Sequence, residues 1–307
     1  MVVRKERRLM KLSEALDYYL ITCRMEGKSP KTIDWYKQKL EAFVAFCDDP
    51  PVRELTLEDA REFVASLWKK DITPQTIHGY VRTLKAFASW LEREGYTPNN
   101  LFKRLKRPKV PKKLIQVLNE EEIKTILKSF NQDTQLGARG YAICVLLLDT
   151  GMRSGELCGI KLSDVDFKRG VIKVKGKGDK ERMVPIGNLA KKALMRYIKV
   201  FRPEPAMGAI DNVFLSVDGY PLTPNAIAKF MRRLAKRTGI ERLHAHLWRH
   251  TSAVRYLMAG GDVFSLQTIL GHETLEMTRH YVQLASRHVE IQHRRFSPAD
   301  NLGLRRR

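Results

Sequence analysis

The chain has 307 residues, of which 56 are lysine or arginine and 34 are aspartate or glutamate, so its formal net charge is +22. A chain of this length is expected to form two domains that each bury a core. So large a positive excess favours a polyanionic partner, although a ribosomal-type or membrane-surface protein would share it. Regular apolar patterning along the chain argues against a disordered basic tail.

The first residues, the longest apolar run and the cysteines indicate the cellular compartment in which the protein is expected. The first residues, MVVRKERRLMKL, lack the apolar stretch of a secretory signal. The longest apolar run, residues 142–148, is too short to span a bilayer. The four cysteines form no CxxC pair and lie in apolar stretches, which indicates buried thiols in a reducing compartment. We therefore expect a soluble, cytoplasmic protein.

Residues 12–95 predict four amphipathic helices, the first over about residues 13–26. Ser29 and Thr73 each precede a proline and fit helix N-caps. Thr56 with Asp59 resembles a capping box. Aromatic residues fall at helical spacing here, and we interpret them as core rather than as platforms for stacking bases.

The segment LFKRLKRPKVPKK, residues 101–113, carries seven basic residues and no acid. Its prolines, Pro108 and Pro111, exclude a regular helix. The segment is predicted to be an interdomain linker. Its charge suits a strap lying along DNA phosphates, and the alternative is a merely flexible tether.

From Leu118 onward the pattern changes. Asn119 followed by three glutamates marks a helix start, with acids at the positive end of the helix dipole. Residues 164–186 predict short strands forming a hairpin with a glycine-rich, basic tip around Lys177. Further helices are predicted over residues 138–149, 189–201, 225–238, 247–259, 263–270 and 275–284.

Three motifs carry candidate chemistry: TGMRSGEL with Arg153, HLWRH with His246 and Arg249, and LGHETLEMTRHY with His272 and Tyr281. Each is ambiguous alone. An arginine at a helix start is more often a salt-bridge residue, and Glu156 one turn on is a natural partner. The HLWRH pair could equally be a zinc site or a buried histidine, and a lone tyrosine on a helix is usually structural.

Together with the lysine of GKGDKER, these motifs resemble in order and spacing the tyrosine recombinase family, also called phage integrases, in its Xer-like or simple-integrase branch. The resemblance covers nearly the whole chain. It implies a mainly α fold with a small antiparallel β-sheet. A helical, SAM-like core-binding domain would occupy residues 1–102, a basic linker 103–113, and an α+β catalytic domain with a C-terminal tail 114–307.

The resemblance also implies a catalytic set, namely Arg153, Lys177, His246, Arg249, His272 and Tyr281. Tyr281 would be the nucleophile, and the two arginines would hold the non-bridging phosphate oxygens. His246 would accept or relay the tyrosine proton, and His272 would add a hydrogen bond.

The remaining role, protonation of the leaving 5′ oxygen, would belong to Lys177. Lys175 and Lys180 are close in the sequence and are the alternatives for this role. Strand alternation places Lys175 and Lys177 on one face, and geometry alone does not choose between them.

By the same resemblance the chain would cut and rejoin double-stranded DNA through a 3′-phosphotyrosine and a Holliday junction. No metal, ATP or other cofactor is expected. The protein would be nucleoid-associated, a monomer in free solution and a homo-tetramer on paired sites, with a second recombinase or accessory factor as a further partner. The tail, residues 286–307, would dock on a neighbouring subunit or be disordered.

Three other interpretations compete with a recombinase. A type IB topoisomerase shares the catalytic set, and a DNA-binding factor that has lost catalysis would share the basic composition. A zinc enzyme could be built on the chain's histidines, although no cysteine or acid completes a familiar ligand set. Its candidate ligands are His244, His246, His250, His272 and His280.

Overall fold

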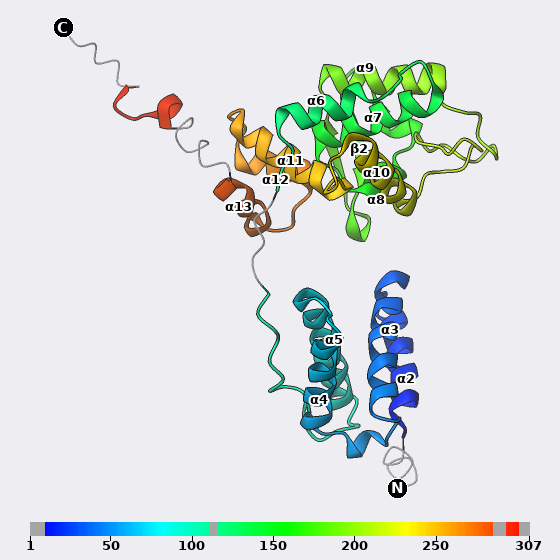
Figure 1. Cartoon of the computed structure of the whole chain (residues 1–307), viewed down its shortest axis with the longest axis vertical. Coiled ribbons are helices and arrows are strands. Elements are labelled where there is room, and N and C mark those ends of the chain that lie inside the picture. The colour runs from blue at the N-terminus through cyan, green and yellow to red at the C-terminus, as the bar shows by residue number, and fades with distance from the viewer. Residues whose placement is uncertain (1–9, 111–115, 285–292, 301–307) are drawn as a thin grey trace. The chain divides into compact units, whose positions relative to one another are not determined.

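The computed structural model describes residues 10–110, 116–284 and 293–300 (Figure 1). The chain divides into two compact units, Met1–Lys113 and Leu114–Arg307. In the described ranges the regular structure is mostly helical, with one three-stranded antiparallel sheet, which confirms the predicted fold class. No helix within these ranges combines the length and apolarity needed to cross a membrane.

Within its described residues, 10–110, the first unit contains four helices, α2 (Leu12–Met25), α3 (Pro30–Phe46), α4 (Leu57–Lys69) and α5 (Pro74–Arg93), with a 3-10 turn at Val52–Glu54. In Figure 1, α2 lies beside α3, and α4 beside α5. The predicted caps are confirmed: the side chains of Ser29, Thr56 and Thr73 each accept a hydrogen bond from the amide three residues later.

Aromatic side chains fill the core of this unit, as predicted. Tyr19 contacts the rings of Phe87 and Trp90, and all three are buried. Phe102 and Leu105, inside the predicted strap, also belong to this core. The start of that segment is therefore anchored to the first unit rather than free.

The basic residues beside these anchors face solvent. Lys103, Arg104, Lys106 and Arg107 are exposed, alternating with the buried Phe102 and Leu105. Lys85 of α5 donates hydrogen bonds to the carbonyls of Lys103 and Leu105, at 2.8 and 3.1 Å, which fixes the backbone. Four cations are thus displayed on an ordered turn.

The second unit contains α6 (Glu120–Lys128), α7 (Gln135–Thr150), α8 (Ser154–Gly159), α9 (Asn188–Arg196), α10 (Pro224–Thr238), α11 (Ala245–Met258), α12 (Val263–Leu270) and α13 (Leu275–Leu284). Helix α7 begins earlier than predicted because the Thr134 hydroxyl caps it, accepting from the amide of Gly137 at 3.1 Å. The helix predicted over residues 189–201 is α-helical only to Arg196 and ends in a π-turn, Tyr197–Phe201.

The sheet of this unit consists of β1 (Val165–Asp166), β2 (Val171–Lys175) and β3 (Glu181–Pro185), in that order and antiparallel. A 3-10 turn at residues Lys177–Asp179, preceded by Gly176, forms the tip between β2 and β3. Gly178 there has a φ of +71°, a backbone conformation that favours glycine. The side chain of Lys177 lies outside the described part of the structure.

Close packing of α7, α11 and α12 sets the frame for the candidate site. Gly151 ends α7 in the left-handed conformation, with a φ of +60°. A Cβ atom added there would lie 2.6 Å from Leu270 Cδ2 and 3.1 Å from Ser252 Oγ. Glycine is thus required at this position for two reasons: the backbone conformation and the close approach of the neighbouring helices.

Candidate active site

Tyr281 lies on α13 with only 4 % of its surface exposed. Its hydroxyl is 2.9 Å from Nδ1 of His250, and its ring stacks nearly parallel on the ring of His272 with centroids 6.1 Å apart. The ring completes a small apolar cluster formed by α11, α12 and α13. Burial raises the pKa of the hydroxyl above its usual value, and the nearby Arg249 opposes this shift.

Two histidines of α11 lie near the hydroxyl: His250 contacts it, and His246 contacts His250. His246 and His250 are one helical turn apart, and their rings meet edge to face with centroids 4.5 Å apart. Burial is the main cause that lowers the pKa of both, that of His250 to about 4. A neutral imidazole is thus available at pH 7 to accept the tyrosine proton.

The predicted proton acceptor, His246, is therefore not the residue that contacts the hydroxyl in this structure. His250 holds that position, and His246 is the next ring away. His250 is the last residue of the HLWRH motif, but the resemblance implied no catalytic role for it. In a helix, residues 246 and 250 share a face, and this spacing was the signal that could have identified it.

His272 follows Gly271, the residue that ends α12 in the left-handed conformation. Its Nδ1 is 2.8 Å from the hydroxyl of the buried Thr278. Burial, followed by the charge of Arg249, lowers its pKa to about 4. His272 is thus a neutral group whose Nε2 can donate one hydrogen bond when Thr278 donates to Nδ1.

Arg249 is buried, with 1 % of its surface exposed. Its Nη1 donates to the carbonyl of Gly151 at 2.8 Å, and its Nη2 donates to the carbonyl of Leu270 at 3.0 Å. These carbonyls end α7 and α12, where helix dipoles are negative, so a buried cation is stabilised there. Burial, with Arg153 nearby, lowers the pKa of Arg249 to about 10, and the group stays charged at pH 7.

Arg153 is the N-cap residue of α8, and 38 % of its side chain is exposed. Its Nη1 donates to Glu156 Oε1 at 2.8 Å, which is the salt bridge that the sequence suggested. The partial exposure leaves the other face of the guanidinium able to hold an anion. Arg153 therefore combines a structural contact with an accessible positive charge.

Glu156 is shared between two arginines. Besides Arg153, it accepts hydrogen bonds from Nη1 and Nη2 of Arg182 at 3.0 and 2.9 Å. Arg182 also donates from Nε to the carbonyl of Ile269 at 2.9 Å, which ties β3 to α12. Burial alone would raise the pKa of Glu156, but the hydrogen bonds from Arg182 and Arg153 outweigh it and lower the pKa.

Neither Arg182 nor this role of Glu156 was predicted from the sequence. Both residues stand in the GKGDKER and TGMRSGEL motifs, so their positions were marked. The missing information was that the side chain of Arg182 points from β3 toward α8 and α12. Strand alternation limits a side chain to one of two faces, but only the packing of the sheet says what covers that face.

A cavity of about 690 Å³ lies beside these groups. Its walls include Arg153, Arg182 and His272, together with Lys180 from the hairpin. Tyr281 and Arg249 lie behind this wall rather than on it. The arrangement can hold a phosphate at the arginines and the imidazole, next to the stacked tyrosine ring.

The described hairpin lysines differ in their surroundings. Lys175 pairs with Asp179 and Glu181 at 3.7 and 3.5 Å, and the charge of Asp179 is the first of the causes that raise its pKa. Lys180 pairs with Glu273 at 3.5 Å and reaches the cavity. A raised pKa makes Lys175 a weaker proton donor than an unpaired lysine.

A zinc centre finds no support in the described ranges. Within them, no group of three or more histidine, cysteine, aspartate or glutamate side chains is placed to hold a metal ion. His246 and His250 meet edge to face, and His250 and His272 flank the tyrosine, so these rings contact one another and Tyr281.

The first unit presents a separate cationic pocket between α3 and α5. Lys39 is 7 % exposed, and its Nζ lies 3.9 Å from the ring centroid of Tyr80 and 5.0 Å from that of Trp35. The guanidinium group of Arg82 also lies over the Trp35 ring, 4.9 Å from its centroid. Burial lowers the pKa of Lys39, and no carboxylate of the described residues pairs with it.

Two family models match the chain. One described as "Phage integrase family" covers residues 116–288, and one described as "Phage integrase, N-terminal SAM-like domain" covers residues 16–97. The chain belongs to the phage integrase family. This integrase is 33% identical over 283 residues to "Tyrosine recombinase XerC" of Oceanobacillus iheyensis, which covers 90% of the chain and 93% of that protein.

One further relative agrees with this assignment, and one solved structure shows the same fold. "Tyrosine recombinase XerD" of Listeria innocua is 32% identical to the integrase over 282 residues, or 89% of the chain and 94% of that protein. The solved structure of the Tn1549 transposon integrase, in complex with transposon right end DNA, superposes with a TM-score of 0.77 at 22% identity. That match covers 94% of this chain and all of the other, and at this identity it shows the shared fold.

The integrase is thus a tyrosine-type, site-specific recombinase of the Xer-like branch, and its activity is DNA recombination. This confirms the family and the enzyme class that the motifs predicted. The topoisomerase, the inactive DNA-binding factor and the zinc enzyme are accordingly set aside.

The shared carboxylate leads to a prediction about stability. Glu156→Gln should lower the free energy of unfolding at pH 7 by about 3 kcal/mol, because it leaves two arginines without their buried counter-charge. The pKa of Glu156 is lowered in the folded state, so its contribution is present above pH 4.5 and is lost as the pH falls through the lowered pKa. Urea unfolding of both proteins at pH 7 and at about pH 3 measures this difference.

The matched control is Glu120→Gln, in which an exposed glutamate paired with Lys124 loses its charge. Exposed pairs contribute little, so this variant should unfold like the parent protein. Equal losses for the two variants, or a Glu156→Gln loss that does not shrink in acid, would contradict the role given to Glu156.

Proposed function

We propose that the chain cuts and rejoins double-stranded DNA with Tyr281 as the nucleophile and Arg153, Arg249, His246, His250 and His272 around the reacting phosphate. The observation that carries this proposal is the convergence of one tyrosine hydroxyl, neutral imidazoles and guanidinium groups beside one open cavity. The proposed role of His250 is an addition to the set that the sequence implied.

In the proposed reaction the oxygen of Tyr281 forms a bond to phosphorus, and the bond from phosphorus to the 5′ oxygen breaks. The products are a 3′-phosphotyrosine and a 5′ hydroxyl, whose proton Lys177 would supply. Negative charge grows on the non-bridging oxygens, and two arginines can hold it without losing their own charge. A 5′ hydroxyl from another strand then reverses the step and joins new partners, so no ATP is needed.

The tyrosine must be released before it can attack. Its hydroxyl is bonded to His250 and its surface is almost fully covered, so the described arrangement is a resting one. We propose that DNA binding shifts α13 so that the hydroxyl reaches the phosphate held by Arg153 and His272. The proton then passes to His250, and the neighbouring His246 can share it.

DNA contacts outside the catalytic site are proposed for the first unit. Residues 1–102 would form the core-binding domain, residues 103–113 the basic linker, and residues 114–307 the catalytic domain. The exposed cations on the ordered turn after Leu101, together with the pocket of Lys39 and Arg82, suit phosphates of the DNA backbone.

Assembly and location complete the proposal. Strand exchange between two duplexes needs four active sites, so we propose a homo-tetramer on paired DNA sites that forms from free monomers and passes through a Holliday junction. A second recombinase or an accessory factor would be a further partner, since names such as XerC and XerD denote distinct proteins among the relatives. The place of action would be the nucleoid in the cytoplasm.

Replacement of the nucleophile tests the reaction itself. Tyr281→Phe should bind DNA like the parent but form no covalent adduct with a nicked substrate that carries the recombination site, sought among repeats flanking the gene. Adducts are detected as SDS-resistant bands. Tyr220→Phe, at an exposed tyrosine, is the control and should form the adduct normally. An adduct formed by Tyr281→Phe would overturn the assignment.

The general acid can be identified with a modified substrate. A 5′-bridging sulfur makes a leaving group that needs no proton, so Lys177→Ala should be slow on ordinary DNA and largely rescued on the sulfur-substituted DNA. Lys175→Ala and Lys180→Ala should show no comparable rescue. Because Lys180 lines the cavity, Lys180→Ala is the more stringent of these two controls. Rescue confined to Lys180→Ala would move the role to that residue.

The basic turn makes a prediction about salt dependence. Replacing Lys103, Arg104, Lys106 and Arg107 by glutamine should weaken DNA binding for all sequences alike. The slope of log affinity against log salt should fall by roughly 0.9 for each phosphate that the variant no longer binds. Lys69→Gln with Lys70→Gln, at exposed positions at the end of α4, is the control. An unchanged slope in the first variant would show that the turn is only a tether.

A further inference from the structure

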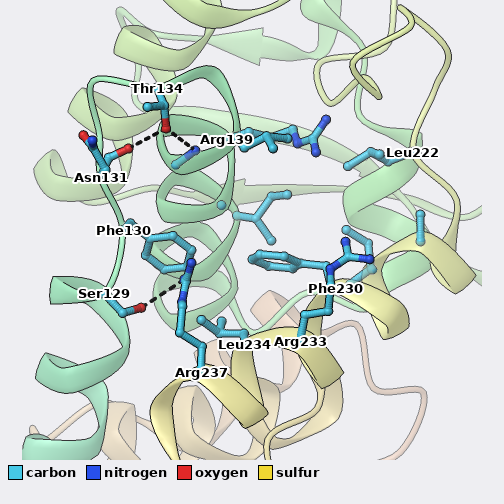
Figure 2. A pocket seen from close by; sticks show the side chains of 16 residues that line it. Ser129, Phe130, Asn131, Thr134, Arg139, Leu222, Phe230, Arg233, Leu234 and Arg237 are labelled. Carbon is cyan, nitrogen blue, oxygen red and sulfur yellow. Dashed lines mark hydrogen bonds between the residues drawn. The ribbon is translucent and has the colours of Figure 1, made fainter.

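A second cavity of the catalytic unit, about 420 Å³ in volume, is separate from the residues of the active site (Figure 2). It lies between the end of α6, the start of α7 and the length of α10. Most of its wall is apolar, with two phenyl rings from different elements, Phe130 and Phe230, 6.2 Å apart between centroids. Gly140 lies against both rings, because an added Cβ would be 2.6 Å from Phe130 and 3.3 Å from Phe230.

Three guanidinium groups line this cavity, those of the half-buried Arg139 and of the exposed Arg233 and Arg237. Arg139, from α7, donates to the carbonyl of Leu215. Arg237, from α10, donates to the hydroxyl of Ser129 at 3.0 Å and lies 4.9 Å from the ring centroid of Phe130. Arg233 is exposed at the rim.

These cations have no counter-charge among the described residues. None of the ion pairs found in the described ranges includes Arg139, Arg233 or Arg237. Burial lowers the pKa of Arg139, and the charge of Arg233 lowers it further, so the two guanidinium groups are close enough to repel. Their only described polar partners are one carbonyl and one hydroxyl, which are neutral.

The combination has a simple physical consequence. Clustered guanidinium groups beside an apolar surface are stabilised by an anion, and charge-assisted hydrogen bonds of this kind are among the stronger ones in proteins. The apolar wall in turn favours a ligand with a hydrophobic body. The volume lies within the range of about 300–1,000 Å³ that is usual for small-molecule sites.

We propose that this cavity binds a small organic anion, with an aromatic or aliphatic body against Phe130 and Phe230 and a carboxylate or phosphate group at Arg139 and Arg233. The site takes no part in the proposed DNA chemistry. A DNA backbone would supply an anionic group but no apolar body. The arginines and the apolar wall together therefore favour a small organic anion. The basic end of the chain, Arg305 to Arg307, is of the wrong charge to fill it.

The test uses the full chain without DNA and 1-naphthoate as the probe, with binding measured by isothermal titration. Neutral 1-naphthamide has the same rings and nearly the same size, and it should bind at least about tenfold more weakly because it cannot pair with the arginines. Equal binding of the two compounds, or no binding of 1-naphthoate, would overturn the proposal.

Two neighbouring arginines of α10 give a matched pair of variants. Arg233→Gln should weaken 1-naphthoate binding by about tenfold, whereas Arg232→Gln, at an exposed position that does not line the cavity, should leave it unchanged. Both variants lose one charge from the same helix, so a general electrostatic effect would weaken binding equally. Equal weakening would therefore also overturn the proposal.

A filling variant tests the cavity independently of charge. Ala226 lines the pocket, and Ala226→Leu adds side-chain volume while keeping the amide that Thr223 caps. It should reduce 1-naphthoate binding by at least about tenfold, and an unchanged thermal midpoint would show that the fold is intact. If this variant bound 1-naphthoate like the parent, the probe would lie elsewhere and the proposal would be overturned. If Ala226→Leu did not fold, the arginine pair would still decide the question.

Discussion

The guanidinium group of Arg249 is buried where α7 and α12 end, and its hydrogen bonds to the Gly151 and Leu270 carbonyls hold these two helix ends together. A charge in this position is tolerated because both helix dipoles present their negative ends to it. Glycines with positive φ end both helices and leave room for the close approach. Because α11 carries Arg249 together with His246 and His250, the same contact fixes the imidazoles relative to α12.

The site holds more positive than negative charge. Glu156 accepts hydrogen bonds from Arg153 and Arg182, and the charge of the same carboxylate also acts on Arg249. Burial together with this excess keeps the pKa of His250 and His272 near 4, so the imidazoles are neutral near pH 7 and act through hydrogen bonds rather than as cations. A DNA phosphate would supply the negative charge that the protein itself does not provide.

Both units present cations on rigid supports. In the first unit, aromatic rings hold Lys39, and the buried Phe102 and Leu105 fix the turn that displays the basic side chains. In the second, Glu156 orients Arg153 while leaving much of its surface exposed. Side chains fixed in this way lose little conformational freedom when they bind a phosphate, which favours affinity without extra contacts.

The sequence by itself determined the helices with clear caps, the hairpin and the family. Ser29, Thr56, Thr73 and Asn119 cap their helices as predicted, because capping depends on residues only three positions apart. The motifs likewise name the tyrosine and the two arginines of the proposed catalytic set, since each motif is local. Only the tertiary structure decided that His250 contacts the hydroxyl of Tyr281, that Arg182 shares Glu156, and that Phe102 and Leu105 belong to the first core. The contact between His250 and Tyr281 joins residues 31 positions apart. The geometry of all these contacts depends on how whole helices and strands pack, which no local pattern specifies.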